Sequence, residues 1–476
     1  MRAIVPVIAL ALAGCASEPS PLALDGDAFE RELSQRFHYG PPQPTPAEIE
    51  DQRAGQIADA AYFAQFPEFD RAYSPAARAE AQRLAAALQA QAGDLSHEQF
   101  VLRVAEIAAL ADNGHTAIGE NAFRKNTPRI PVRTYQFADG LHILWADPVH
   151  ADLLGARIDT IEGRSVADIQ RAIRRYAGGT DAHRQRSLVA MLESPALLQA
   201  AGLSDSRAEL TLTGVLEDGR PFERTIAAEE RDRSAWVSSS ARLLFPARPN
   251  FRMRSFLADG EELPVYLRRR SELFTLDDLP QRGVYIGLSH NADTDESPIA
   301  QFLDSALARV RGARPAYVVL DMRLNGGGDY TTTYAFARAL PQAAAGAPIY
   351  VLTSSWTFSA AITTVAALKD EGGRQVIIVG EPVGDRLDFW AEGGAFELPN
   401  TFLEAYYASG RHVYDGPCRD LDQCFWLNYR YPVRVRSLAP DIAAPLTFDA
   451  YRQRRDPAME AVLERESTRG SNARTR

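Results

Sequence analysis

Two segments of the chain contain residues that could carry out acyl transfer. Ser359 follows an apolar, strand-like run at residues 349–353 and leads into an Ala-rich helical pattern. Upstream of it, the sequence DMRLNGGGD at residues 321–329 follows another apolar run. Adjacent glycines leave backbone N–H groups open to an anion, so this turn is suited to an oxyanion, although a plain tight turn has the same composition. A lone serine at a helix start is usually a cap, and the pairing with the glycine turn makes Ser359 a candidate nucleophile.

A serine nucleophile needs a general base, and His115 is the candidate. It directly follows Asn113 and Gly114, which end a helical pattern that begins at Ser96. Histidine titrates near neutral pH, so it can take the serine proton and return it to the leaving group. Lys369 cannot serve, because it lies about three helical turns beyond the serine. The alternative for His115 is a histidine that only forms a hydrogen bond at a helix end.

Together with further motifs, these residues resemble the tail-specific (carboxyl-terminal processing) serine proteases. The matching segments lie within residues 95–460 and are NGHT at 113–116, the glycine turn, the serine with its helix, GEPVG at 380–384 and PDI at 440–442. The resemblance implies hydrolysis of peptide bonds through an acyl-enzyme, with Ser359 as the nucleophile. It also implies an oxyanion hole made by the backbone N–H of Gly327 or Gly326 together with that of Ala360.

The base distinguishes two branches of this family. In the processing branch a lysine lies in the turn after the next strand, whereas this chain has GDR at residues 384–386. Arginine cannot act as a base near neutral pH. The chain therefore resembles the non-lysine branch, typified by the tricorn protease core, in which a histidine comes from the N-terminal region. This resemblance implies His115 as the base.

An acid should hold the imidazole of His115 in one tautomer. In the family this acid lies between the nucleophile helix and the late Pro-Asp element. The same interval of this chain contains Asp415, Asp420 and Asp422, and we take Asp415 as the candidate. The alternative is that each of these acids is solvated in a loop.

The hydrophobic periodicity changes along the chain, and a length of 476 residues predicts two or three domains. The later part alternates strands with helices, which predicts an α/β fold, and the family resemblance implies a crotonase/Clp-protease-like core. Residues 155–166 and the helix after them resemble the carboxylate-binding part of a PDZ domain, with an unrelated small β-domain as the alternative. The predicted parts are an N-terminal helical region at 28–126, a β-rich PDZ-like module at 130–235, the α/β core at 236–465 and a flexible tail at 466–476.

The first residues have the pattern of a secretion signal. A charged start and an apolar run too short to cross a membrane end in LAGC at residues 12–15. This ending resembles a bacterial lipobox, which implies a lipoprotein signal peptide at 1–14, lipidation of Cys15 and a tether at 15–27. An ordinary signal peptide with a chance cysteine is the alternative. Because Ala16 is not an acid, the resemblance also implies an exported protein, anchored by lipid in the outer membrane of a Gram-negative cell and facing the periplasm.

The net charge and the cysteines limit which partners the protein is expected to bind. The net charge of −10 argues against general nucleic-acid binding, which needs clustered Lys and Arg. Cys418 and Cys424 lie in a loop-like stretch and are expected to form a disulfide in an exported protein, with metal binding by this pair as the weaker alternative. No metal or nucleotide cofactor is implied, and the membrane is expected to contact only the N-terminal lipid.

The expected partner is a peptide or protein substrate, but two other functions use the same residues. One is a non-catalytic binding protein for a peptide or an apolar ligand, because a fold does not settle function. The other is an esterase for small molecules. A His115 remote from Ser359 would favour the binding protein, whereas a deep, narrow pocket would favour the esterase.

Overall fold

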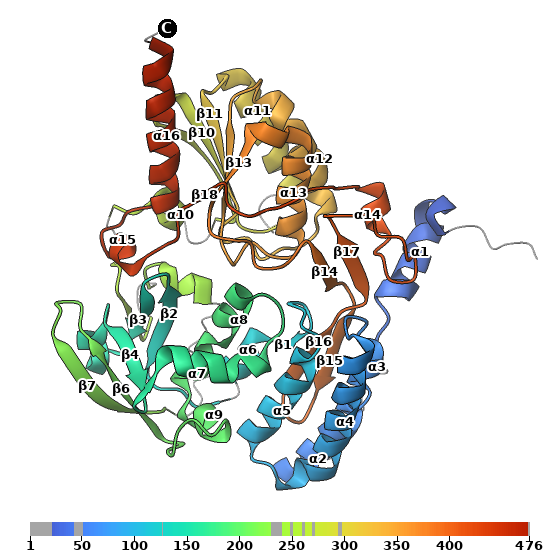
Figure 1. The fold of residues 1–476 in the computed structure, drawn as a ribbon, viewed down its shortest axis with the longest axis vertical. Helices are drawn as coiled ribbons and strands as arrows, with labels where there is room; N and C mark the ends of the chain where they lie inside the picture. The colour runs from blue at the N-terminus through green and yellow to red at the C-terminus, as the bar shows by residue number, and fades with distance from the viewer. Residues whose placement is uncertain are drawn as a thin grey trace, which may run out of the picture.

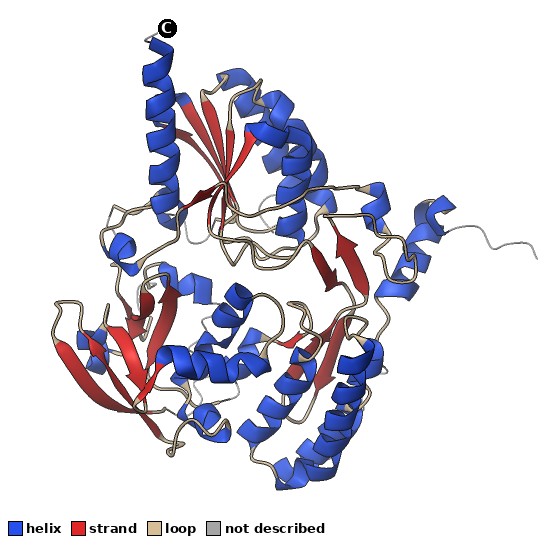
Figure 2. Cartoon of the chain, viewed as in Figure 1, coloured by secondary structure: helices blue, strands red, loops and turns tan. Residues whose placement is uncertain are grey.

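The computed structural model describes residues 21–41, 51–125, 127–229, 240–247, 251–258, 262–268, 272–293 and 298–474. Figure 1 shows an α/β core at the top, the β-rich module at the lower left and the helical region at the lower right. Figure 2 shows that strands occur in all three parts, and they belong to separate sheets. The predicted signal peptide, Cys15 and the first part of the tether lie outside the described residues.

The core contains a six-stranded sheet. All neighbouring strands pair in parallel except β9 with β10. Its central strands are apolar and buried along their whole length, as expected for a sheet covered on both faces. Because β11 and β12 are parallel neighbours, the segments that follow them meet at one edge of the sheet. The strand order is β18 (Ile442–Ala443), β13 (Val376–Gly380), β12 (Ile349–Thr353), β11 (Tyr317–Asp321), β10 (Gly283–Leu288) and β9 (Phe274–Leu279).

Helices cover both faces of this sheet (Figure 1). One face packs in a single hydrophobic cluster with α11 (Ile299–Ala313), α12 (Thr331–Ala343) and α13 (Ala360–Gly372). The other face packs on α16 (Pro457–Arg474), through residues such as Tyr350 and Val462. Residues 466–474, expected as part of a flexible tail, continue this helix, and buried Glu466 accepts a hydrogen bond from Tyr350 at 2.5 Å. The apolar contacts and this bond anchor α16 on the sheet.

The β-rich module is a seven-stranded antiparallel sheet. One strand comes from beyond residue 235, so the module extends past the predicted boundary. The helices that pack with it include α7 (Val166–Ile173), α8 (Asp181–Leu188) and α9 (Pro195–Ala200). The strands are β2 (Val132–Phe137), β3 (Gly140–Ala146), β4 (Arg157–Ile161), β5 (Arg164–Ser165), β6 (Glu209–Val215), β7 (Pro221–Ala227) and β8 (Arg254–Ser255).

The N-terminal helical region is completed by a hairpin from the second half of the chain. Its helices are α2 (Gln52–Phe63), α3 (Phe66–Phe69), α4 (Pro75–Gln91) and α5 (His97–Ala109). Ser96 and Gln99 form a capping box at the start of α5, as the sequence predicts. β1 (Ala117–Ile118) follows the exit of α5 and pairs with β16 (Leu403–Tyr407), which in turn pairs with β15 (Gly394–Leu398). A segment predicted to belong to the core therefore packs with the helical region.

Helix α1 (Gly26–Phe37) belongs to the N-terminal part of the chain but packs on the core. It was expected in the helical region, yet its aromatic side chains pack against the core segment that follows β17 (Gly410–Val413). Phe37 contacts Phe425 edge to face, with ring centroids 5.3 Å apart. The predicted disulfide between Cys418 and Cys424 is present in the same segment.

Two features are missing from the described residues. None of the helices there is both long and apolar enough to cross a membrane. In the same part of the chain, no three His, Cys, Asp or Glu side chains are grouped so that they could hold a metal ion.

Buried Asp70, which follows α3, ties the helical region to the turn that carries His115. Its carboxylate accepts hydrogen bonds from Thr116 Oγ1 at 2.6 Å, Ala408 N at 2.9 Å and Ala72 N at 2.8 Å. Burial raises the pKa of Asp70 to about 6, although these bonds and the nearby Arg78 act to lower it. The folded protein therefore holds this proton more tightly than the unfolded chain does.

We predict that Asp70→Asn removes one component of the pH dependence of stability. Since the pKa is raised on folding from 3.8, the contribution of Asp70 is fully present below that pH and is lost as the pH rises through about 6. This difference in pKa corresponds to about 3 kcal/mol at most. Relative to wild type, the free energy of unfolding of the variant should therefore rise by about 2 to 3 kcal/mol between pH 3.5 and 7. Urea unfolding at both pH values measures it, and an identical pH dependence in the two proteins would contradict the prediction.

Candidate active site

Ser359 lies at a strained turn between β12 and α13. Its backbone has φ +55° and ψ −128°, a conformation that residues other than glycine rarely adopt. Its side chain accepts no capping hydrogen bond from the helix that it precedes. The turn is closed by bonds from Ala361 N to Phe358 O at 3.1 Å and from Ile362 N to Ser359 O at 2.8 Å. A strained strand-to-helix turn of this kind presents a serine hydroxyl to a substrate.

The glycine turn after β11 lies directly against Ser359. Gly327 has φ +116°, and a Cβ atom added there would lie 2.7 Å from Ser359 Cβ. Gly328 has φ +127°, and its added Cβ would lie 2.4 Å from Asn291 O. An added Cβ on Gly326 would meet nothing within 4 Å. The close packing of this turn therefore requires glycine at positions 327 and 328 but not at 326.

Two fully buried asparagines fix the glycine turn. Asn325 accepts a hydrogen bond from Gly327 N at 2.9 Å and donates one to Asn291 Oδ1 at 2.8 Å. Asn291 N donates to Gly327 O at 2.9 Å, and its side chain donates to Thr364 on α13 at 2.8 Å. Phe358 N donates to Asn325 O at 3.0 Å, so the serine segment is held by the same residue. A buried polar network with its partners in place is rigid, and this one fixes the turn and the serine together.

This network also determines which N–H groups could hold an oxyanion. The N–H of Gly327 is engaged by Asn325, whereas those of Gly326 and Ala360 have no acceptor in the described part of the chain. Ala360 is the first residue of α13, where a helix leaves its N–H groups unpaired. Of the predicted donors, the geometry favours Gly326 and Ala360.

His115 reaches the serine segment at the exit of α5. Its ring stacks on Phe358 with centroids 4.4 Å apart and 23° between the planes, and on Phe389 at 5.5 Å. Gly114 permits this approach, because a Cβ there would lie 2.9 Å from Phe358 Cε2 and 2.8 Å from Asp385 Oδ2. His115 therefore lies against the residue that precedes Ser359.

The carboxylate beside His115 is that of Asp385, in place of the expected Asp415. Asp385 Oδ2 lies 3.7 Å from His115 Nδ1, and the Asp385 side chain is 1% exposed. Asp415 is exposed in the segment that follows β17. Asp385 belongs to the turn after β13, where the family resemblance expects the lysine of the other branch. An acid in that turn was the signal that could have identified it from the sequence.

Three buried polar atoms at this site have no hydrogen-bond partner within the described residues. They are Nδ1 and Nε2 of His115 and Oδ2 of Asp385. No hydrogen bond joins the ring of His115 to Ser359. Buried polar atoms are nearly always paired, and exceptions are common at sites that bind or transform a ligand. Hydrogen bonds between catalytic groups are often long until a substrate is bound.

A cavity of about 400 Å³ opens beside His115. His183 and Glu392 also line it, and the sequence signalled neither, since they lie in segments without a motif. Burial lowers the pKa of His183 well below its usual value, and Arg186 and His115 lower it further. Burial acts to raise the pKa of Glu392, but the hydrogen bond from His412 leaves it lowered. Aromatic residues on the wall are Phe123, Tyr176, Trp356, Phe358, Tyr406 and Tyr407.

The fold is similar to that of CPAF. No protein-family model and no curated protein sequence matches the chain. Mature CPAF is 11% identical with a TM-score of 0.51, over 87% of this chain and 97% of CPAF. A CPAF mutant is 11% identical with a TM-score of 0.54, over 85% and 95%. The photosystem II D1 C-terminal processing protease is 12% identical with a TM-score of 0.36, over 84% and 95%. At these identities, the likeness to CPAF shows a shared fold.

Substitution by alanine should have different effects at Gly327 and at Gly326. Gly327→Ala places a methyl group against Ser359 and forces an unfavourable φ, so we expect reactivity of the serine toward a fluorophosphonate to fall at least about 100-fold. Gly326→Ala has room for the methyl group and keeps the N–H, so it should retain most of the reactivity. Labelling rates followed by intact mass measure both variants. Equal losses in the two would contradict the geometry.

Proposed function

We propose that this protein is a serine peptidase with Ser359 as nucleophile, His115 as general base and Asp385 as the acid that orients the base. One observation carries the proposal. A strained, uncapped serine packs against a glycine turn, and a histidine–carboxylate pair with unpaired polar atoms lies beside it. A capping serine would accept a bond from its own helix, and a structural histidine would have its ring nitrogens paired.

The mechanism is acyl transfer. His115 Nε2 takes the proton of Ser359 Oγ as this oxygen attacks the carbonyl carbon of a peptide bond. The carbonyl oxygen becomes negatively charged and receives hydrogen bonds from the N–H groups of Gly326 and Ala360. His115 then gives the proton to the amine that leaves, and a water molecule activated by the same nitrogen hydrolyses the acyl-enzyme. Asp385 faces Nδ1 and keeps the proton there, so that Nε2 is the accepting nitrogen.

The sequence motifs support a finer assignment to the tail-specific proteases, in the branch with a histidine base that the tricorn protease core typifies. We assign the parallel sheet with its two helical layers as a crotonase/Clp-protease-like core. We assign the antiparallel sheet as a PDZ-like module, because α7 directly follows the short strand β5. A peptide or protein is the proposed substrate, since the cavity beside His115 is lined by aromatic side chains that suit the side chains of a polypeptide.

We also propose where in the cell the protein acts. The LAGC ending at residues 12–15 supports export, removal of the signal peptide and lipid attachment at Cys15. The membrane would then be the outer membrane, with the folded part in the periplasm. Gel analysis of cells grown with a radiolabelled fatty acid, comparing wild type with Cys15→Ala, tests the anchor separately from catalysis.

Binding without catalysis is the second candidate, and one observation favours it. Ser359 and His115 are not joined by a hydrogen bond, as a binding protein would allow. The two candidates differ in whether the serine is chemically activated, so a probe of serine reactivity separates them.

Labelling with a fluorophosphonate should modify wild-type protein at Ser359 and leave Ser359→Ala unmodified. His115→Ala and Asp385→Asn should each slow labelling at least about 100-fold, because the first removes the base and the second its orientation. Asp415→Asn is the matched control and should label at the wild-type rate, since this residue is exposed and away from His115. Intact mass and peptide mapping give the rates and the site, and unfolding temperatures show whether each variant is folded.

Digestion of a denatured protein then separates peptidase from esterase. Mass spectrometry of unfolded casein should show fragments with wild type and none with Ser359→Ala. Labelled protein that cleaves p-nitrophenyl esters but yields no fragments would favour the esterase, and an unlabelled wild type would favour the binding protein.

A further inference from the structure

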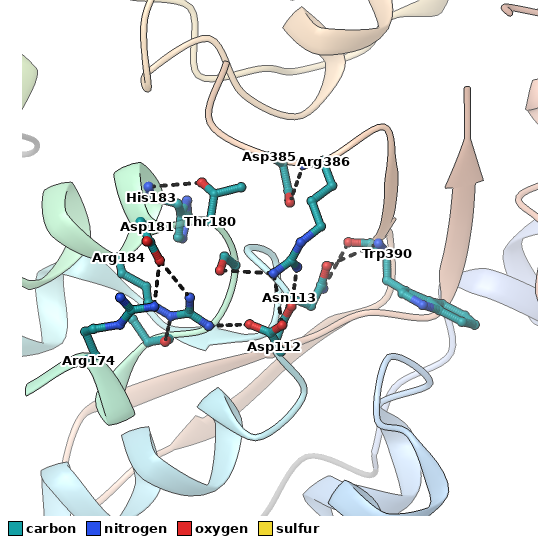
Figure 3. A network of polar contacts seen from close by, with 12 residues as sticks. Asp112, Asn113, Arg174, Thr180, Asp181, His183, Arg184, Asp385, Arg386 and Trp390 are labelled. Carbon is teal, nitrogen blue, oxygen red and sulfur yellow. Dashed lines mark hydrogen bonds and ion pairs between the residues drawn. The ribbon is translucent and has the colours of Figure 1, made fainter. Parts of the chain in front are cut away.

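Asp112 connects three parts of the molecule at the turn that carries His115. It lies just beyond the end of α5 with φ +50°, in the left-handed region that few residues except Gly, Asn and Asp tolerate. Both carboxylate oxygens and the main-chain carbonyl oxygen of Asp112 accept hydrogen bonds from arginines (Figure 3). The arginines come from parts of the chain far from α5 in sequence.

Arg386 holds Asp112 from the core. Its Nη1 donates to Asp112 O at 2.8 Å, and its Nη2 donates to Asp112 Oδ2 at 2.9 Å and to Gly179 O at 3.3 Å. Arg386 directly follows Asp385, the carboxylate at His115. One turn therefore supplies the acid that faces the imidazole and the cation that holds the backbone before it.

Arg184 holds Asp112 from the β-rich module. It extends from α8, donates to Asp112 Oδ1 and to Ala177 O at 2.9 Å, and is only 16% exposed. The module also makes backbone contact with the turn, because a Cβ on Gly178 would lie 2.7 Å from Asn113 N. Figure 3 shows Arg184 and Arg386 reaching Asp112 from two sides.

The position of His115 depends on the backbone of the turn that starts at Asp112. Both ring nitrogens lack hydrogen-bond partners among the described residues, so the ring is placed by stacking on Phe358 and Phe389 and by the Asp385 carboxylate 3.7 Å from Nδ1. Aromatic rings pack in a range of offset arrangements, so stacking alone does not fix where Nε2 lies along the ring of Phe358. The backbone must therefore set how far Nε2 is from Ser359. Asn113, the next residue, is fixed by bonds between its side-chain amide and the backbone of Trp390 at 3.0 and 3.1 Å.

We propose that Asp112 is a positioning residue for His115, held jointly by Arg386 of the core and Arg184 of the β-rich module. The turn places His115 correctly only while both arginines bind Asp112, so docking of the module is part of assembling the site. We call Asp112, Arg386 and Arg184 the clamp. Its effect on catalysis rests on the proposed function, whereas its effect on the position of His115 does not.

The first experiment measures the placement of His115 without using activity. Asp112→Asn keeps a residue that tolerates the left-handed conformation and removes the charge that binds both arginines. Carbethoxylation of individual histidines by diethyl pyrocarbonate, followed by peptide mass spectrometry, should proceed several-fold faster at His115 in this variant. His142 is buried against Phe448 in the β-rich module and serves as the internal reference. Asp152→Asn is the matched control, because Asp152 is 52% exposed and paired with Arg224, as Asp112 is 55% exposed and paired with Arg386.

Arg386→Gln should also speed the modification of His115, because it removes the bonds to Asp112 O and Oδ2 while Arg184 stays in place. The effect of the double variant should be smaller than the sum of the two single effects, because both substitutions remove the pair between Arg386 and Asp112. If His115 reacts in both variants as it does in wild type and in Asp152→Asn, the clamp does not position the histidine and the proposal is overturned. The unfolding temperature of each variant is recorded in parallel, so faster modification counts only when it occurs in folded protein.

The second experiment measures the catalytic consequence. In folded Asp112→Asn, we expect the maximal rate of fluorophosphonate labelling to fall about ten-fold while the concentration for half-maximal rate is unchanged, because small displacements of a catalytic group act on the chemical step. A change confined to the half-maximal concentration would contradict positioning. If wild type is not labelled at all, the proposed function fails, and the carbethoxylation result still decides whether Asp112 positions His115.

Discussion

The close contact between Gly327 and Ser359 is the constraint on which the candidate site depends. A serine with φ +55° would relax if the neighbouring segment could move, and the asparagine network prevents this by bonding both the glycine turn and the serine segment. Any side chain at Gly327 would separate them, because its Cβ would lie 2.7 Å from that of Ser359. The parallel pairing of β11 and β12 makes the contact possible by bringing both turns to one edge of the sheet.

The histidine side of the site is assembled from a much wider range of sequence. Its turn ends α5, the acid comes from the turn after β13, and the module contributes Arg184 and the loop that contains Gly178. The serine side of the site is thus a local property of two adjacent strands, whereas the position of His115 depends on how the helical region, the module and the core dock. A shift in docking would move His115 and leave Ser359 and the glycine turn in place.

This division explains how much could be predicted from the sequence. The serine, the glycine turn and the alternation of strands and helices are local patterns, and the structure has them where they were expected. Asp385 was not predicted beside His115 because the two residues are far apart in the chain, and the late acids considered in its place are exposed. Helix α1 packs on the core and the hairpin β15–β16 packs with the helical region, and both placements depend on contacts between distant parts of the chain. The pairing of β1 with β16 involves only two residues of β1, so it leaves no periodic signal in the sequence.

The unpaired atoms of the site give a reason to regard the free protein as poised for a ligand. Nδ1 and Nε2 of His115 and Oδ2 of Asp385 have no hydrogen-bond partner among the described residues, so each can bond to a ligand. The strain at Ser359 adds a cost of about 1 to 3 kcal/mol. A pocket that only bound an apolar ligand would gain nothing from either feature. Both become useful if a peptide carbonyl draws the serine, the histidine and the carboxylate into one chain of hydrogen bonds, because the unpaired atoms then acquire their partners as the reaction begins.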